Sequence, residues 1–244
     1  MYNPFSLIEK NILITGASSG LGRSIAIEVS KMGASVVITG RNKERLQDTY
    51  CKLTGSGNSQ IVCDLINSES YNNLCKELPQ LDGVVMCAGI PCSTPVKHNS
   101  DSFMRELFET NTFVNFNFSK FLISKSKINK KGSIIFISSV AANRPYKGNS
   151  IYSASKAAIN SFAKVLALEV AYKEIRVNCI SPGIIPTKAN DSAFSDDDLV
   201  QQNNKIPLGF GKPSAIANGS IYLLSDASEW VTGINLIVDG GQSL

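Results

Sequence analysis

Residues 11–22 read Asn-Ile-Leu-Ile-Thr-Gly-Ala-Ser-Ser-Gly-Leu-Gly, an apolar run that leads directly into glycines at 16, 20 and 22. Glycine permits a tight turn and lets a bound group approach the backbone closely. The following residues are apolar at helical spacing, namely Leu21, Ile25, Val29 and Met32. This spacing predicts an amphipathic helix, and the free N–H groups at the start of such a helix attract phosphate. The stretch therefore predicts a strand, a turn and a helix around a dinucleotide pyrophosphate.

The rest of the chain alternates short apolar runs with longer amphipathic ones, the pattern of βαβ units and a parallel sheet. We expect strands at Asn11 to Thr15, Ser35 to Thr39, Gln60 to Cys63, Gly83 to Cys87, Ser133 to Ser138, Arg176 to Ile180 and Asn235 to Val238. We expect helices at about 20–32, 43–53, 68–78, 101–128, 151–173 and 214–225, with N-caps at Ser68, Asp101 and Ser214. The apolar run 134–137 indicates a strand that is buried on both faces, so the fold class is α/β.

Composition favours one globular domain of 244 residues with a formal charge of +4. Dense Lys/Arg tracts with interleaved aromatic residues are absent, which argues against a nucleic-acid partner. Neither a signal peptide nor an apolar run of about 18 residues occurs, so we expect a cytoplasmic protein without a membrane partner. The six cysteines form no Cys-x-x-Cys pair, and His98 is the only histidine, so we expect reduced thiols and no metal site.

One segment does not fit the alternating pattern. Residues 184–213 combine Gly, Pro and polar residues around a short acidic run. Long loops in compact domains are usually lids or binding loops. We therefore expect a substrate lid at about 184–213.

Tyr152 lies 13 residues after Ser139 and opens a Tyr-Ser-Ala-Ser-Lys stretch. This spacing places Lys156 on the same helical face as Tyr152. Opposite charges about 5 Å apart interact by roughly 3 kcal/mol at an effective dielectric of about 20. Our hypothesis is that Lys156 lowers the pKa of Tyr152 from near 10 towards about 8, which suits a general acid. Tyr172 and Arg176 share the spacing and are interpreted as a helix surface and a strand start. The spacing of Tyr152 and Lys156 is therefore weak evidence by itself, and it is supported by the neighbouring motifs.

The second strand ends at Gly40-Arg41, where dinucleotide-binding folds commonly carry a carboxylate for the ribose hydroxyls. Gly40 leaves room, and the planar cation of Arg41 suits a 2′-phosphate. We therefore expect NADP (NADPH) as cofactor in preference to NAD. The alternative is that Arg41 is a solvated residue at a helix start.

Together these residues resemble the short-chain dehydrogenase/reductase family over nearly the whole chain. The matching motifs are Thr-Gly-x-x-x-Gly-x-Gly at 15–22, Asp64, Ala88-Gly89, Asn111, Ser139, Tyr152-x-x-x-Lys156, Pro182-Gly183 with Thr187, Val231-Thr-Gly233 and Asp239-Gly-Gly241. The resemblance implies a single Rossmann-type domain over 1–244, with a doubly wound parallel seven-stranded sheet and helices on both faces. It also implies an NAD(P)-dependent enzyme that moves a hydride between the nicotinamide and a carbonyl or secondary alcohol.

The family's catalytic roles fall on four residues of this chain. Tyr152 would pass a proton to the carbonyl oxygen, which Ser139 would hold. Lys156 would bind the nicotinamide ribose, and Asn111 would anchor a water that links Lys156 to solvent. An asparagine inside a helix is locally unfavourable, which makes a functional reason for Asn111 easier to accept than a solvent-facing one.

The resemblance also implies a set of cofactor contacts. Asp64 and Leu65 would contact the adenine, and the backbone from Pro182 to Ile185 with Thr187 would contact the nicotinamide amide. The full set is Gly16, Ser18, Ser19, Gly20, Leu21, Gly22, Arg41, Asp64, Leu65, Ala88, Gly89, Tyr152, Lys156, Pro182, Gly183, Ile185 and Thr187.

One departure concerns the fourth strand, which ends in Met86-Cys87-Ala88-Gly89 where family members usually carry Asn-Ala-Gly. The family asparagine ties neighbouring strands together, so its loss puts local hydrogen bonding in doubt. Cys87 and Cys92 are either redox-active thiols beside the cofactor or structural residues, and we favour the structural interpretation.

The run from Lys205 to Pro213 is similar to that of bacterial 3-oxoacyl-carrier-protein reductases. Lys130 and Lys173 fall where those enzymes meet the acidic acyl carrier protein, although lysines also occur there simply as helix-end residues. A sugar, polyol or other secondary-alcohol dehydrogenase is the alternative, and a non-catalytic dinucleotide sensor is the alternative of another class. The resemblance further implies a homo-oligomer, a tetramer, in which helices at 101–128 and 151–173 pack against a second subunit.

Overall fold

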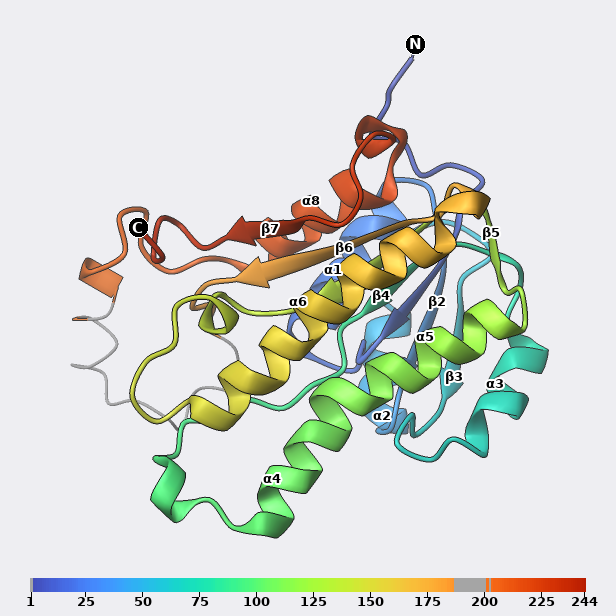
Figure 1. The fold of residues 1–244 in the computed structure, drawn as a ribbon. Helices are drawn as coiled ribbons and strands as arrows, with labels where there is room; N and C mark the ends of the chain where they lie inside the picture. Colours follow the sequence, from blue (N-terminus) through green and yellow to red (C-terminus); the bar gives the residue numbers. More distant parts are fainter. Residues whose placement is uncertain (1, 187–200, 202) are drawn as a thin grey trace.

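A computed structural model describes residues 2–186, 201 and 203–244 of the chain (Figure 1). Seven parallel strands form one sheet in the order β3-β2-β1-β4-β5-β6-β7. The strands are β1 (Asn11–Thr15), β2 (Ser35–Gly40), β3 (Ser59–Val62), β4 (Leu81–Met86), β5 (Ile128–Ile137), β6 (Arg176–Pro182) and β7 (Asn235–Val238). The predicted parallel α/β sheet is therefore confirmed. Thr187 and half of the expected lid at 184–213 lie outside the described residues.

The helices alternate with the strands along the chain. The α-helices are α1 (Gly20–Lys31), α2 (Lys43–Tyr50), α3 (Ser70–Glu77), α4 (Asp101–Phe108), α5 (Val114–Ser124), α6 (Ser150–Val170) and α8 (Pro213–Leu224). The short helical turns are η1 (Val96–His98), the π-helix η2 (Glu109–Phe113), η3 (Val140–Ala142), η4 (Ala171–Lys173) and η5 (Asp226–Ser228). The expected single helix at 101–128 is thus interrupted by a π-turn between α4 and α5, and β5 begins at Ile128, earlier than expected.

Two hydrophobic layers cover the sheet, one on each face. Successive residues of β5 alternate between them: Ile134 and Phe136 pack with α5 and α6, while Ile135 and Ile137 pack with α1 and α8. This alternation follows from the two-residue period of a strand, and it explains why the strand sequences are almost continuously apolar.

The predicted N-caps were wrong for local reasons. Helix α4 is capped by the Ser100 hydroxyl, which accepts from Phe103 N at 3.2 Å, one residue before the expected Asp101. Lys212 is the N-cap of α8 because Pro213 occupies the first turn, where its missing N–H does no harm. Glu69 precedes α3 without a side-chain cap.

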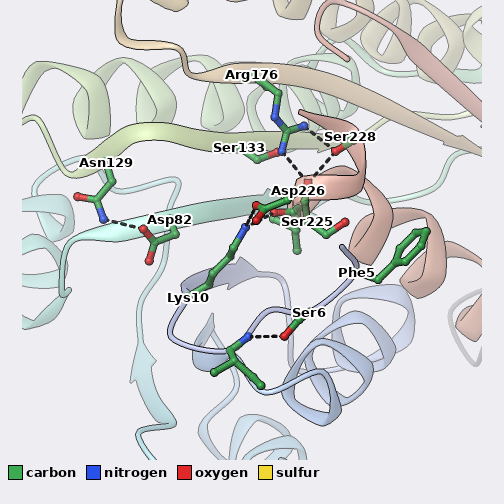
Figure 2. A network of polar contacts seen from close by, with 12 residues as sticks. Phe5, Ser6, Lys10, Asp82, Asn129, Ser133, Arg176, Ser225, Asp226 and Ser228 are labelled. Atoms are coloured by element: carbon green, nitrogen blue, oxygen red, sulfur yellow. Dashed lines mark hydrogen bonds and ion pairs between the residues drawn. The ribbon is translucent and has the colours of Figure 1, made fainter. Parts of the chain in front are cut away.

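The amino-terminal edge of the sheet is held by a polar network (Figure 2). The buried Arg176 guanidinium donates to Ser228 Oγ at 2.8 Å and to Ser225 O at 3.3 Å. Near it, Lys10 pairs with Asp226 at 2.6 Å. Burial lowers the pKa of Arg176. These bonds fix the edge opposite to the one where the glycine turn lies.

The carboxyl-terminal edge carries the point where the strand order reverses, between β1 and β4. Chain segments leave β1 and β4 towards opposite sides there, and ligands of open α/β sheets bind in the resulting crevice. Thr15 Oγ1 accepts from Cys87 N at 3.0 Å and from Ala88 N at 3.4 Å, and this ties the two strand ends together. The site described below is built at this edge.

Candidate active site

The turn between β1 and α1 requires glycine at two positions because the backbone packs against itself. Gly16 has φ +65°, and a Cβ there would lie 2.9 Å from Ala88 Cα. A Cβ on Gly22 would lie 2.4 Å from Gly16 O. Gly20 differs: it also has positive φ, +55°, but nothing lies within 4 Å of where its Cβ would be. The turn is therefore tightly packed against the rest of the protein at Gly16 and Gly22, whereas space is left beside Gly20.

The start of α1 offers donors to an anion. Ser19 is the N-cap, yet its side chain makes no cap hydrogen bond, and the first turn carries no acidic residue. Behind the turn, Arg23 Nη2 donates to Ser18 O at 2.7 Å and its Nε donates to Thr49 Oγ1 at 2.9 Å, which fixes the turn. Exposed Ser19 and Gly20, half-buried Leu21 and the helix dipole together fit a pyrophosphate group.

The ends of β2 and β3 form the side on which the adenosine of a dinucleotide would lie. Arg41 is exposed and its side chain has no hydrogen bond or ion pair with the part of the chain that the structure describes. Asp64 is exposed and accepts from Ile66 N at 3.1 Å, while its neighbour Leu65 is buried. Arg41 and Asp64 are therefore exposed at the crevice edge, and Arg41 is free to bind an anion.

The segment after β6 is shaped by a close approach to the end of β7. A Cβ on Gly183 would lie 2.8 Å from Asp239 Cα, and Ile184 N donates to Gln242 Oε1 at 2.8 Å. Arg144, on the loop after η3, donates to Gln242 O and, at 2.7 Å, to Leu244 O. Sequence reasoning missed Gln242 and Arg144 because the partners are about a hundred residues apart and carry no motif of their own.

Helix α6 brings Tyr152 and Lys156 to the carboxyl end of β5. Lys156 is only 5% exposed; its Nζ donates to Ile137 O at 2.9 Å and lies 5.8 Å from the centre of the Tyr152 ring. Ser139 follows β5 in extended conformation and accepts from Ala141 N at 3.2 Å, and its hydroxyl is close enough to the Tyr152 phenol to lower the pKa of that group. Three of the four predicted catalytic side chains therefore meet at one place.

Asn111 lies in the π-helix η2 and is fully buried. Its Oδ1 accepts from Ile90 N at 2.7 Å, and its Nδ2 donates to Ile90 O at 2.9 Å and to Ser155 Oγ at 3.4 Å. A Cβ on Gly89 would lie 3.1 Å from Asn111 Oδ1 and 3.4 Å from Lys156 Nζ. Asn111 and Lys156 thus converge on the place where Gly89 lacks a side chain, and the burial of Asn111 excludes the solvent-facing alternative.

The expected fall in the pKa of Tyr152 towards 8 was wrong for the free protein. Burial raises the pKa of Tyr152 to about 12, against the lowering effect of its hydrogen bond with Ser139. Burial likewise lowers the pKa of Lys156 to about 8. The ammonium lies 5.8 Å from the centre of the ring, and its charge does not offset the loss of water around the phenol.

The thiols near the site are structural. All six cysteines are free, and burial raises the pKa of Cys87 and of Cys179 to about 12. The thiolate is the reactive form of cysteine, so both are inert at neutral pH. Because the Cys87 N–H is bound by Thr15 Oγ1, the strand ends stay tied without a side-chain amide at position 87.

Neither a membrane-spanning helix nor a metal-binding cluster occurs among the described residues. No helix in this part of the chain has the length and apolar character needed to cross a membrane. No group of three or more His, Cys, Asp or Glu residues that could hold a metal ion occurs in the same part of the chain.

Comparisons with known proteins agree with this geometry. A family model described as enoyl-(acyl carrier protein) reductase matches residues 16–243. The 3-oxoacyl-(acyl-carrier-protein) reductase FabG of Rickettsia felis is 36% identical over 238 residues, covering 96% of this chain and 97% of that reductase. The 2,5-dichloro-2,5-cyclohexadiene-1,4-diol dehydrogenase LinX of Sphingobium indicum is 33% identical, covering 98% of both. A solved structure titled short chain dehydrogenase/reductase family protein superposes with a TM-score of 0.85 at 30% identity, covering 98% and 100% of the two chains.

The buried charge of Lys156 leads to a stability prediction. Replacing Lys156 with Met should stabilise the ligand-free protein at pH 7 by about 1–3 kcal/mol, after allowance for the lost bond to Ile137 O. Below pH 8 the folded and unfolded chains both carry the proton, so the folded state bears the full desolvation penalty. Between pH 8 and 10.5 only the folded chain releases its proton, which removes the penalty, so wild type and variant should converge.

Urea unfolding at pH 7 and at pH 10 measures this difference. Lys164→Met, an exposed change on the same helix, is the control and should alter the free energy of unfolding by less than about 0.5 kcal/mol. A Lys156→Met variant that is less stable than wild type by the same amount at both pH values would contradict the prediction.

Proposed function

Since the chain belongs to the short-chain dehydrogenase/reductase family and is therefore an oxidoreductase, we propose that it uses NADP(H) to interconvert a carbonyl group and a secondary alcohol. The observation that carries the proposal is the meeting of Ser139, Tyr152 and Lys156 at the crevice where the glycine turn opens. A proton donor, an oxygen-binding hydroxyl and a buried cation beside a dinucleotide site suit carbonyl reduction.

The chemistry divides among the side chains as follows. Tyr152 donates its hydroxyl proton to the carbonyl oxygen, and the Ser139 hydroxyl, which lies next to Tyr152, holds that oxygen. When bound, the nicotinamide cofactor supplies the hydride. A phenol with a pKa of about 12 releases its proton reluctantly, so the Lys156 charge is needed as the tyrosinate develops. Lys156 would also hold the ribose hydroxyls, and Asn111 would support the water from which protons return.

The preference for NADP(H) rests on the end of β2. Arg41 is exposed and free of partners among the described residues, so its guanidinium can bind a 2′-phosphate without breaking an existing bond. A Cβ on Gly40 would lie 3.4 Å from Ser18 Oγ, so the absence of a side chain keeps this corner open. No carboxylate at this position competes for the phosphate.

Arg41→Ala tests the cofactor assignment. Loss of one charge-assisted contact of about 1.5–3 kcal/mol should raise the KM for NADPH by about ten- to a hundredfold and leave the KM for NADH nearly unchanged. Steady-state kinetics with both cofactors measure the two effects. Lys52→Ala, an exposed cation beyond the end of α2, is the control. Better use of NADH than of NADPH by the wild-type enzyme would contradict the assignment.

For the substrate we propose a 3-oxoacyl thioester, carried by acyl carrier protein. The similarity to FabG supports this, as does the basic surface at Lys130 and Lys173. Lys130 pairs with Glu174 at 2.6 Å, and Lys173 lies 3.4 Å from Ser126 Oγ, so the two cations share one exposed corner with Lys131. Glu174 pairs with Lys130 and Lys131, while Lys173 has no ion pair with the part of the chain that the structure describes, which leaves positive charge for an acidic carrier. Both reaction partners would be met in the cytoplasm.

A second candidate is the oxidation of a sugar, polyol or other secondary alcohol. The similarity to LinX, named as a diol dehydrogenase, favours it. The same Ser139 and Tyr152 would serve either direction, because proton donation to a carbonyl is the reverse of proton removal from an alcohol.

Turnover with a substrate panel tests the function. Wild-type protein should oxidise NADPH with a 3-oxoacyl thioester, and Tyr152→Phe, which keeps the ring but lacks the proton, should lower kcat by about a hundred- to ten-thousandfold. Equal rates in both proteins would remove Tyr152 from the mechanism. Turnover only with diols or sugars would select the second candidate, and tight NADPH binding without any turnover would favour a sensor.

The carrier protein is tested in the same assay. Lys173→Glu should raise the KM for an acyl-carrier-protein thioester several-fold and leave the KM for a small thioester unchanged. A variant with both KM values unaltered would show that the lysines are ordinary surface residues.

We further propose a homotetramer. The outer faces of α5 and α6 enclose a groove of about 480 Å³ whose lining includes Phe116, Phe162, Leu166 and Tyr172. Next to it Val165 is 52% and Leu168 79% exposed, and Trp230, between β6 and β7, is 96% exposed. Apolar surface of this extent on two sides is typical of contacts with further copies of the chain.

Light scattering should return a mass of about four times 26.3 kDa. Leu168→Arg should lower that mass because it places a charge in the α5/α6 contact, whereas Lys76→Glu on exposed α3 should not. A wild-type protein of 26.3 kDa in solution would contradict the tetramer.

A further inference from the structure

Asn115 lies in the first turn of α5, one turn after Asn111, and is 2% exposed. Its Nδ2 donates to the main-chain oxygen of Asn111 at 2.6 Å. A π-turn departs from the regular i→i+4 ladder, so its carbonyl groups need other partners, and such turns occur often at functional sites. In this chain the side-chain amide of Asn115 binds the main-chain carbonyl of Asn111, which lies within the π-turn.

The position of Asn111 affects the surroundings of Lys156 through Ile90 and Gly89. Both amide atoms of Asn111 are bonded to Ile90, the residue after Gly89. Gly89 has no Cβ, and the position that a Cβ would occupy is close to both Asn111 Oδ1 and Lys156 Nζ, so the two atoms converge beside the Gly89 backbone. A shift of the Asn111 backbone would therefore move the Gly89–Ile90 segment after β4 and change the surroundings of the Lys156 ammonium.

The other amide atom of Asn115 points to a second role. Asn115 Oδ1 is buried and has no hydrogen-bond partner among the described residues. Buried acceptors are rarely left without a donor, and a water molecule is the usual one. The family resemblance implies that Asn111 anchors a water, and the main-chain oxygen of Asn111 already accepts from Asn115 Nδ2. In this chain Asn115 Oδ1 is the adjacent acceptor that has no donor of its own.

We propose that Asn115 is a positioning residue for proton delivery: its Nδ2 holds the π-turn that places Asn111, and its Oδ1 accepts from the water that resupplies Lys156. The inference rests on the proposed reductase function. Asn115 would contact neither the substrate nor the cofactor, so its effect should appear in proton transfer and not in substrate or cofactor affinity.

A matched pair of substitutions isolates the donor. Thr and Val have nearly the same shape, but a threonine hydroxyl in a helix can donate to the carbonyl four residues back. Ser119 makes such a bond in this helix, to Asn115 O at 2.7 Å. Asn115→Val should therefore lower kcat by about tenfold or more with KM values within about twofold, and Asn115→Thr should keep kcat within about threefold of wild type.

Three further measurements separate positioning from general stability. The solvent deuterium isotope effect on kcat should grow about twofold in Asn115→Val only, because proton resupply becomes slower. Hydrogen exchange of the Ile90 amide should be faster in that variant. Ser119→Ala, which removes the equivalent bond one turn later, should change stability by a similar amount and leave kcat and the isotope effect unchanged.

Asn115→Asp provides an independent check if Asn115→Val does not fold. A carboxylate cannot donate to Asn111 O, but its protonated form can, so the activity of this variant relative to wild type should rise as pH falls. Equal kcat values in wild type, Val and Thr variants would overturn the proposal, as would equal losses in Val and Thr. A wild type without turnover on any substrate would instead overturn the proposed function, while unchanged Ile90 exchange in Asn115→Val would overturn the positioning role by itself.

Discussion

The bonds between Lys156 and the end of β5 hold the whole site together. Lys156 Nζ donates to Ile137 O, and Lys156 O accepts from Ser138 Oγ at 3.3 Å, so side chain and main chain are both attached to one strand end. This double attachment sets how far α6 lies along the sheet. It therefore decides that Tyr152, one turn earlier, meets Ser139, the residue that follows the same strand.

Stability and chemistry are assigned to opposite edges of the sheet. At the amino-terminal edge, Arg176 is buried but hydrogen-bonded, and the ion pair of Lys10 with Asp226 lies nearby. At the carboxyl-terminal edge, Lys156 is buried with a single side-chain hydrogen bond and a pKa of about 8. The first arrangement secures the sheet, and the second leaves a buried cation at the edge where the proposed site lies. The two buried cations are separated by the length of the strands, so a change around Lys156 need not loosen the bonds of Arg176.

Local patterns predicted the fold well, because they are set by neighbouring residues. Apolar runs gave all seven strands, with β1 and β7 at their observed bounds, and the glycine spacing at 16, 20 and 22 gave the turn. The wrong or missing predictions concern features that depend on contacts between residues far apart in the sequence. The π-turn depends on bonds from Asn111 to Ile90, and the contact of Arg144 with Gln242 joins segments about a hundred residues apart. The phenol's acidity was misjudged because the depth of burial is a property of the packed chain and not of the Tyr-Lys spacing.

The two thiols near Lys156 have a consequence for the response of the protein to peroxide. Burial raises the pKa of Cys87 and of Cys179 to about 12, which disfavours the negatively charged sulfur that peroxide attacks. Cys51, by contrast, lies exposed at the surface. We expect a burst of peroxide to mark that surface before it modifies the strand ends beside Lys156.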